Sequence, residues 1–352
     1  MLIPEKIKTI AAPLPELLPA DIVVDANESF RLFPEDIARE MAEELAATPL
    51  NRYPDPLARK VCLPAAEYYG VGAEQITAGC GSDELISVIV NALVPPEGRL
   101  LLCEPDFGTY RFCAELRGCV CVASKRVDGR PDLAALLNEA REGDCVIFSN
   151  PCNPTGQGIA REETLDMVRR APCLVVVDEA YMDFWDQSAV SAIGELENLI
   201  ILRTASKSVG LASIRLGFAL AGETLTGFIR KAKLPYNVTG PTQSIGAAAY
   251  RHPEWLRQNA ATLRESAQNL FGALSALLAG REGYGLTDTI TNFILLCPPD
   301  AQELYKFLLA RGIRVRILGG ARPLLRITGG AENENAAVIA AIGEFIKEGN
   351  TP

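Results

Sequence analysis

The chain has 352 residues, 48% of them hydrophobic, which is enough for about two domains and for large buried cores. It carries 34 lysines and arginines against 44 aspartates and glutamates, and this net charge of −10 argues against nucleic acid or an anionic membrane as the main partner. The single histidine, His252, excludes three-histidine zinc sites and leaves lysine as the obvious group for moving protons.

Residues 1–30 read as an irregular arm, because four prolines (Pro4, Pro13, Pro15 and Pro19) interrupt regular structure. The first residues lack the apolar core of a targeting segment, and no run in the chain approaches the ~18 apolar residues of a membrane span. We therefore expect a cytoplasmic protein.

Residues 31–240 alternate between helical patterns and short apolar runs. Helices are expected at 35–47, after Pro56, at 82–93, 132–141 and 162–170. Strands are expected at 75–78, 99–103, 119–123, 145–149, 173–177, 199–203 and 216–221. This alternation predicts an α/β fold, with a large, mostly parallel sheet covered by helices on both faces.

The ten cysteines contain no C-x-x-C pair. Cys119 and Cys121 are two apart on an expected strand, which is weak spacing for metal ligands. We expect reduced thiols in the core and no metal site.

Residues 241–352 predict a smaller α+β domain. A long helical stretch, 242–278, contains Pro253 and is followed by strands at 292–297 and 324–328 and helices at 301–311 and 334–347. The predicted organisation is thus an arm at 1–30 that packs with the small domain, a large domain at 31–240 and the small domain at 241–352.

Polar groups follow several of the expected strands, where open α/β sheets bind ligands. Gly79–Glu84 offers free amide groups for one phosphate, although it also suits a helix start capped by Ser82 or Asp83. Asn153 stands in a proline-rich turn after the 145–149 strand, and this segment could also be merely a tight turn. Asp178 ends a buried strand, where it needs a cationic ring nitrogen, a salt bridge or a helix start to satisfy it.

Lys207 is the remaining key residue. It lies among Thr204, Ser206 and Ser208 after a strand, with Arg215 close behind. Lysine can form an imine, and hydroxyl groups with a guanidinium can hold a phosphate. A solvated surface charge would explain any one of these residues alone, but not their order on successive strand ends.

These residues resemble the fold-type I pyridoxal-phosphate (PLP) enzymes, the class I/II aminotransferases, over nearly the whole chain. The resemblance implies the three-layer PLP-transferase fold. Within that family the chain is similar to histidinol-phosphate aminotransferases, and threonine-phosphate decarboxylases share several of the motifs. The motifs are Asn27–Glu28, Arg52–Pro56, Gly79–Glu84, Asp178–Phe184, Pro235–Val238, Thr291–Ile294 and Leu325–Thr328.

The resemblance implies roles at the cofactor. Lys207 would bind it as an imine and then move the proton, Asp178 would pair with the ring nitrogen, and Tyr110 would stack on the ring. The expected cofactor-binding residues are Ser82, Asp83, Tyr110, Asn153, Asp178, Tyr181, Thr204, Ser206, Lys207 and Arg215, with Tyr53 reaching in from a partner subunit.

The resemblance also implies a substrate end and a homodimer with shared active sites. Arg326, Arg316 and Asn27 would receive the substrate, and two guanidinium groups suit a phosphate. The expected activity is transamination of histidinol phosphate with 2-oxoglutarate, in histidine biosynthesis. The alternatives are a threonine-phosphate decarboxylase of the cobalamin pathway, an aromatic amino-acid aminotransferase, and a PLP-binding regulator without catalysis.

Overall fold

Seven apolar runs of the sequence form one sheet in the computed structural model, which describes residues 7–8, 10, 18–320 and 322–348. The strand order is β2-β8-β7-β6-β5-β3-β4. The strands are β2 (Ile76–Cys80), β3 (Arg99–Glu104), β4 (Val120–Lys125), β5 (Cys145–Ser149), β6 (Leu174–Asp178), β7 (Leu199–Thr204) and β8 (Leu216–Ala221).

The sheet is mostly parallel, as predicted. β3 to β7 run parallel to one another, whereas β8 runs antiparallel to both β7 and β2. Helices cover both faces and close two apolar cores. The helices of one face are α3 (Arg59–Tyr69), α6 (Leu133–Glu139), α7 (Arg161–Arg170) and α9 (Gly240–Tyr250), and those of the other are α4 (Gly81–Ala92), α5 (Thr109–Arg117) and α8 (Glu223–Ala232).

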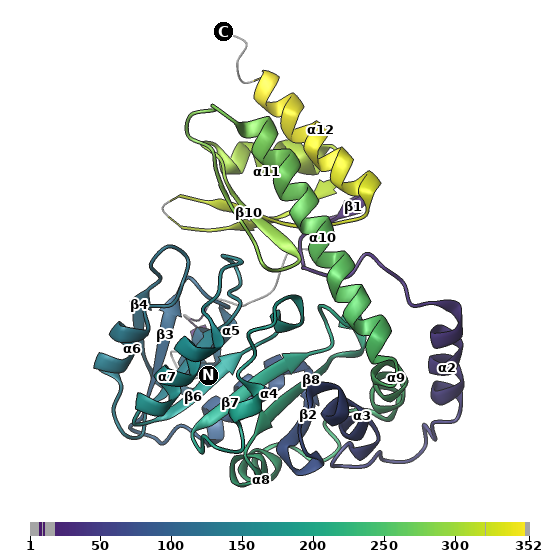
Figure 1. The fold of residues 1–352 in the computed structure, drawn as a ribbon, viewed down its shortest axis with the longest axis vertical. Helices are drawn as coiled ribbons and strands as arrows, with labels where there is room; N and C mark the ends of the chain where they lie inside the picture. The colour runs from purple at the N-terminus through teal and green to yellow at the C-terminus, as the bar shows by residue number, and fades with distance from the viewer. Residues whose placement is uncertain (1–6, 9, 11–17, 321, 349–352) are drawn as a thin grey trace.

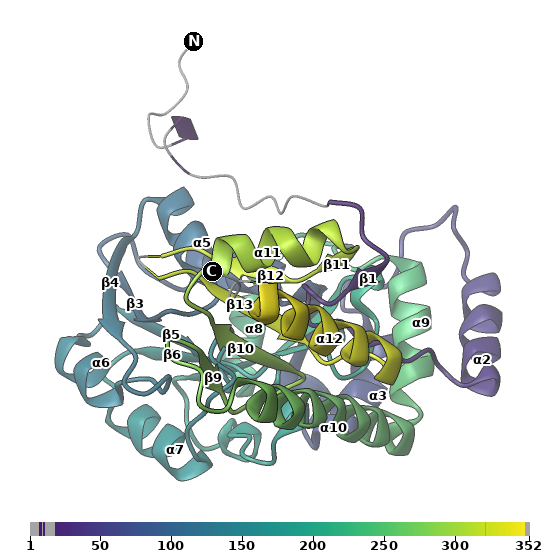
Figure 2. The same ribbon diagram turned by 90° about the horizontal axis from the view of Figure 1, so that it is seen from above.

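A second, antiparallel sheet of order β12-β13-β10-β9 lies beyond the first (Figure 1). Its strands are β9 (Gly285–Thr287), β10 (Phe293–Cys297), β12 (Arg316–Leu318) and β13 (Leu324–Thr328). The helices α11 (Ala301–Ala310) and α12 (Glu332–Glu348) pack with it around a third apolar core, and Figure 2 shows both from above. The expected α+β character of the C-terminal region is confirmed.

The described end of the N-terminal arm joins this smaller part. β1 (Ile22–Val23) pairs in parallel with β11 (Ile313–Arg314), and Val24 lies in the apolar core there. Residues 1–6, 9 and 11–17 of the expected arm lie outside the described residues.

The prediction of one helical stretch over 242–278 is wrong. α9 ends at Tyr250, and α10 (Pro253–Leu278) begins anew at Pro253. Proline lacks an amide hydrogen and has a fixed φ, so it suits the first position of a helix and disrupts the interior. The break lets α9 pack with α3 and with α2 (Glu35–Ala46), while α10 runs from the large sheet to the small one (Figure 1).

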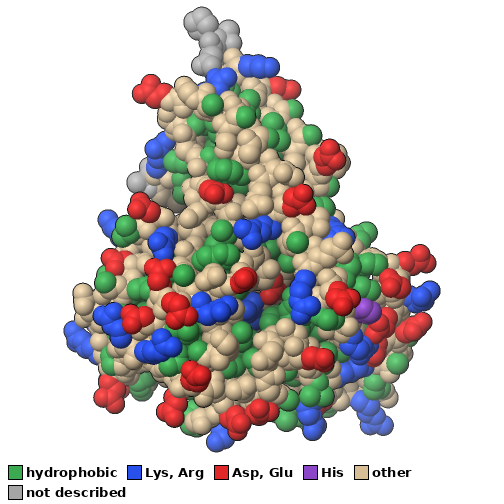
Figure 3. All heavy atoms as spheres, viewed as in Figure 1, with side chains coloured by type: hydrophobic (Ala, Val, Ile, Leu, Met, Phe, Trp, Pro, Cys, Tyr) green, Lys and Arg blue, Asp and Glu red, His purple; other side chains and the backbone are tan. Residues whose placement is uncertain are grey.

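Four short 3-10 helices complete the described chain, namely η1 (Ala73–Gln75), η2 (Met182–Phe184), η3 (Val190–Ala192) and η4 (Ala212–Ile214). No described helix is both long and apolar enough to cross a membrane. On the face drawn in Figure 3, acidic and basic side chains are interspersed rather than gathered into one large basic area.

Candidate active site

Chemically active side chains gather at the carboxyl edge of the large sheet. Asp178 is the last residue of β6, Asn153 follows β5, and Lys207 follows β7. Because parallel strands end at a common edge, these residues approach one another although the chain separates them widely. The site is therefore a product of the sheet topology.

Lys207 is half-buried, and its amine points toward the N-terminal segment. The Nζ atom donates a hydrogen bond of 2.7 Å to the carbonyl of Ala26. Burial, with repulsion from Arg326 added to it, lowers the pKa of Lys207 to about 8. Roughly a tenth of the amine is thus unprotonated at pH 7, far more than for an ordinary lysine, and a nucleophile or base requires this form.

Asp178 is buried, and the negative charges of Asp106 and Asp83 act on it. It accepts hydrogen bonds from the hydroxyl of Tyr110 at 2.6 Å and from the amide of Ala180 at 3.0 Å. Burial raises its pKa to about 7, although both donors act in the opposite direction. No lysine or arginine of the described chain pairs with this carboxylate, so a cationic ring nitrogen placed beside it would satisfy it.

Tyr181, Asn27, Asn153 and Arg326 form a second group beside Lys207. The Nδ2 atom of Asn27, which is fully buried with a φ of 55°, donates to the hydroxyl of Tyr181 at 2.8 Å. Arg326 donates to the side-chain oxygen of Asn153 and, at 2.7 Å, to the carbonyl of Asp25. The side-chain Nδ2 atom of Asn153 is left to donate elsewhere.

The start of α4 and Arg215 form a cradle at the end of the site away from Arg326. Arg215 pairs with Asp83 at 2.7 Å, and a Cβ atom added to Gly81 would lie 2.8 Å from the same guanidinium. Neither Ser82 nor Asp83 caps α4: the helix begins at Gly81 and has no side-chain cap. The amide of Gly81 donates to the carbonyl of Arg215 at 2.9 Å, whereas the next amide groups of the helix have no side-chain cap and suit an anion.

Hydroxyl groups line the approach to Lys207. The Thr204 hydroxyl donates to Ser206 at 3.0 Å, and the Ser206 amide donates back to Thr204 at 3.1 Å. These bonds hold the turn that carries Lys207. The expected phosphate-binding groups thus converge, apart from Tyr53, which is 82% exposed and stacks on Tyr236 at 4.6 Å.

Arg316 and Arg326 are register partners on the antiparallel strands β12 and β13. Arg326 is buried, and no described residue accepts a hydrogen bond from its Nε atom. Burial lowers the pKa of Arg326, and the charge of Arg316 adds to this effect. Two like charges placed opposite each other destabilise a sheet unless an anion lies between them.

The sequence did not predict the buried ion pairs that support the loops of the site. Arg203 is buried and pairs with Glu179 and Asp183, both at 2.8 Å. Asp183 also accepts from the hydroxyl of Ser208, the neighbour of Lys207. The pairing joins the loop of Tyr181 to the loop of Lys207, and no spacing in the sequence indicates it.

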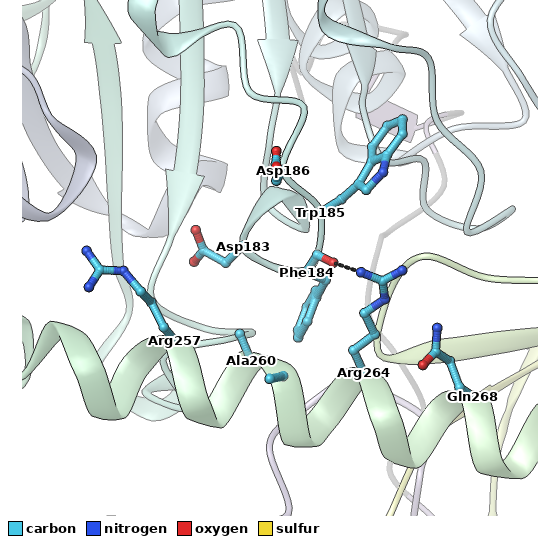
Figure 4. A pocket seen from close by; sticks show the side chains of 9 residues that line it. Asp183, Phe184, Trp185, Asp186, Arg257, Ala260, Arg264 and Gln268 are labelled. Carbon is cyan, nitrogen blue, oxygen red and sulfur yellow. Dashed lines mark hydrogen bonds between the residues drawn. The ribbon is translucent and has the colours of Figure 1, made fainter.

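A pocket of about 410 Å³ lies elsewhere, between residues 183–186 and α10 (Figure 4). Arg264 donates to the carbonyl of Phe184 across it at 3.0 Å, and Asp183 and Arg257 lie toward its other end. None of the predicted site residues lines it, although Asp183, which pairs with Arg203, does. No group of acidic residues, cysteines or histidine that could hold a metal occurs in the described chain.

Comparisons with known proteins agree on one family. The family model for aminotransferase class I and II matches residues 22–342. The histidinol-phosphate aminotransferase of Clostridium kluyveri is 38% identical over 332 residues, 93% of each chain, and that of Chromobacterium violaceum is 40% identical over 333 residues, 92% of each chain. The crystal structure of histidinol-phosphate aminotransferase from Sinorhizobium meliloti in complex with pyridoxal-5'-phosphate has a TM-score of 0.86 at 22% identity, and it covers 99% of this chain and 98% of its own.

Proposed function

Because the chain belongs to the aminotransferase class I and II family, we propose that it is a PLP enzyme that transfers the amino group of histidinol phosphate to 2-oxoglutarate. The amine becomes a ketone, and the oxo acid becomes glutamate. The observation that best supports this substrate is the opposed pair Arg316 and Arg326, because histidinol phosphate has a phosphate dianion and no carboxylate.

The residues at the sheet edge fit pyridoxal phosphate. A buried carboxylate without a cation (Asp178), a lysine with a lowered pKa (Lys207) and a glycine cradle beside Arg215 are the donor set that it requires. When bound, this cofactor supplies an electron sink for the substrate carbon that carries the amine. Lys207 binds the cofactor and, once displaced by substrate, moves the proton at that carbon.

The other site residues orient the cofactor. Asp178 pairs with the ring nitrogen, Asn153 and Tyr181 donate to the ring oxygen, and Tyr110, whose hydroxyl contacts Asp178, stacks on the ring. The phosphate is held by residues at the start of α4 and around the Lys207 turn, namely Ser82, Asp83, Thr204, Ser206 and Arg215. Asn27 borders the substrate, since its side chain bonds to Tyr181.

A homodimer is part of the proposal, with Tyr53 reaching the cofactor phosphate of the partner subunit. Exposed apolar side chains near Tyr53, and in the loop of its stacking partner Tyr236, support the homodimer. Leu50 is 76% exposed, Tyr53 82% and Leu234 74%, an unusual exposure of large apolar groups.

Two further expectations stay proposals. We retain the division into an arm at 1–30, a large domain at 31–240 and a small domain at 241–352. We also retain a cytoplasmic location, which the ten free cysteines support because thiols stay reduced there.

The relatives at 38% and 40% identity favour histidinol phosphate over threonine phosphate and over aromatic amino acids. The test is formation of glutamate from 2-oxoglutarate with each amino donor, alongside release of carbon dioxide from threonine phosphate. We expect the highest kcat/KM with histidinol phosphate. Release of carbon dioxide without transamination would contradict the proposal.

A further inference from the structure

A buried ion pair lies beneath the active site. Asp106 follows β3 and Arg126 follows β4, and their side chains are only 4% and 1% exposed. Burial raises the pKa of Asp106, and the positive charge of Arg126 opposes this rise. Because apolar residues often replace buried ion pairs without loss of stability, the pair needs a reason other than stability.

The carboxylate of Asp106 joins three strand ends. It accepts from the amide of Phe107 at 2.8 Å, from the amide of Ser149 at 3.1 Å and from the hydroxyl of Ser149. Arg126 donates to Oδ2 of Asp106, the oxygen that also accepts from the Ser149 amide, and to the carbonyl of Pro105 at 2.8 Å. The ends of β3, β4 and β5 are thereby held in one arrangement.

Two cofactor contacts of the proposed function depend on this arrangement. The backbone amide of Asn153 donates to the hydroxyl of Ser149 at 3.2 Å, and that hydroxyl donates to Asp106, so two hydrogen bonds through Ser149 connect Asn153 to Asp106. The amide of Tyr110 donates to the carbonyl of Phe107 at 3.2 Å, and the two rings meet edge to face at 5.7 Å. Ser149 is also the register partner of Asp178.

We infer that Asp106 and Arg126 are positioning residues, whose ion pair sets Asn153 and Tyr110 at the correct places for the cofactor ring. The inference rests on the proposed function, because Asn153 and Tyr110 act there through the ring. Asp106 and Arg126 themselves do not touch the cofactor.

A displaced Asn153 gives a weaker hydrogen bond to the ring oxygen. The oxygen then keeps more negative charge beside the imine proton and holds that proton more strongly. The pH midpoint of the visible absorbance band of bound cofactor should therefore rise, by roughly 0.5–1 unit for the loss of one hydrogen bond.

The experiment compares holoenzymes carrying Asp106→Asn and Ser149→Ala with wild type. Ser149→Ala removes the link to Asn153 without leaving a buried charge unpaired, so it remains informative should Asp106→Asn fail to fold. Asp144→Asn is the matched control. Asp144 pairs with Arg99 at 2.6 Å and holds the opposite ends of the same strands, β3 and β5.

We expect a raised midpoint and weaker cofactor retention in both site variants, and a wild-type midpoint in Asp144→Asn. An unchanged midpoint in Ser149→Ala, with cofactor bound, would overturn the inference, and so would an equal rise in Asp144→Asn. A wild-type protein that shows no cofactor band would instead contradict the proposed function itself.

Discussion

Arg316 and Arg326 lie directly opposite each other on the neighbouring strands β12 and β13. The pairing places a half-buried guanidinium beside a buried one whose Nε atom lacks a partner among the described residues. This arrangement opposes folding in the absence of an anion and favours binding of a dianion. It therefore links the geometry of the smaller sheet to the choice of substrate.

Replacing Arg326 with Gln should lower kcat/KM for histidinol phosphate by roughly 10²–10³-fold, because a buried charged hydrogen-bonding partner is lost. Histidinol, which lacks the phosphate, should be affected far less. Steady-state kinetics with both amines measure the difference. Arg322→Gln is the control, since Arg322 is an exposed arginine just before β13. Equal losses of kcat/KM with the two amines would show that Arg326 does not bind the phosphate.

Replacing Asp178 with Asn should stabilise the cofactor-free protein at alkaline pH. The folded pKa of about 7 exceeds the ordinary value of 3.8, so the folded state binds the extra proton between these values. The free energy of unfolding of wild type consequently falls as pH rises through this window. The free energy of unfolding of Asp178→Asn relative to wild type should rise by roughly 1–3 kcal/mol between about pH 5 and about pH 8.

Urea unfolding at the two pH values measures this growth. Asp144→Asn is the control, because the pKa of Asp144 is lowered and its carboxylate is ionised throughout the range. If the two proteins differed by the same free energy of unfolding at both pH values, the carboxylate of Asp178 would not be a buried group that lacks a cationic partner. With cofactor bound, Asp178→Asn should lose activity, because the ring nitrogen loses its partner.

Active sites shared between subunits predict complementation. Tyr53→Ala and Lys207→Ala should each be impaired alone, yet a mixed dimer has one site with Lys207 from one subunit and Tyr53 from the other. Co-expression should restore up to about a quarter of wild-type activity, since half of the dimers are mixed and each has one intact site. Activity no higher than that of the separate variants would contradict the placement of Tyr53.

Much of the large sheet could be predicted from the sequence. The apolar runs and the turns that separate them are local features, and strands such as β5 and β7 lie within a residue or two of their expected bounds. α5 and α8 were not predicted. α5 begins at Thr109 and contains Tyr110, Phe112, Cys113 and Ala114, so its pattern is short and mixed.

The site could be predicted only where its residues sit in local motifs. Asn153, Asp178 and Lys207 each follow a strand, and parallel strands bring such residues together. The supporting pairs could not be predicted in this way. Asp106 meets Arg126, and Arg203 meets Asp183, only because strand order and loop path place them there.

The measurement that tests the central claim most directly is a single half-reaction of the holoenzyme with histidinol phosphate and no oxo acid. Wild type should lose the visible band of its cofactor and form one ketone per active site, and Lys125→Ala, which alters an exposed lysine at the end of β4, should do the same. The rate of Lys207→Ala should be roughly 10²–10⁴-fold lower, because the group that moves the proton is absent. Conversion by Lys207→Ala at the wild-type rate, or no conversion by wild type, would contradict the account.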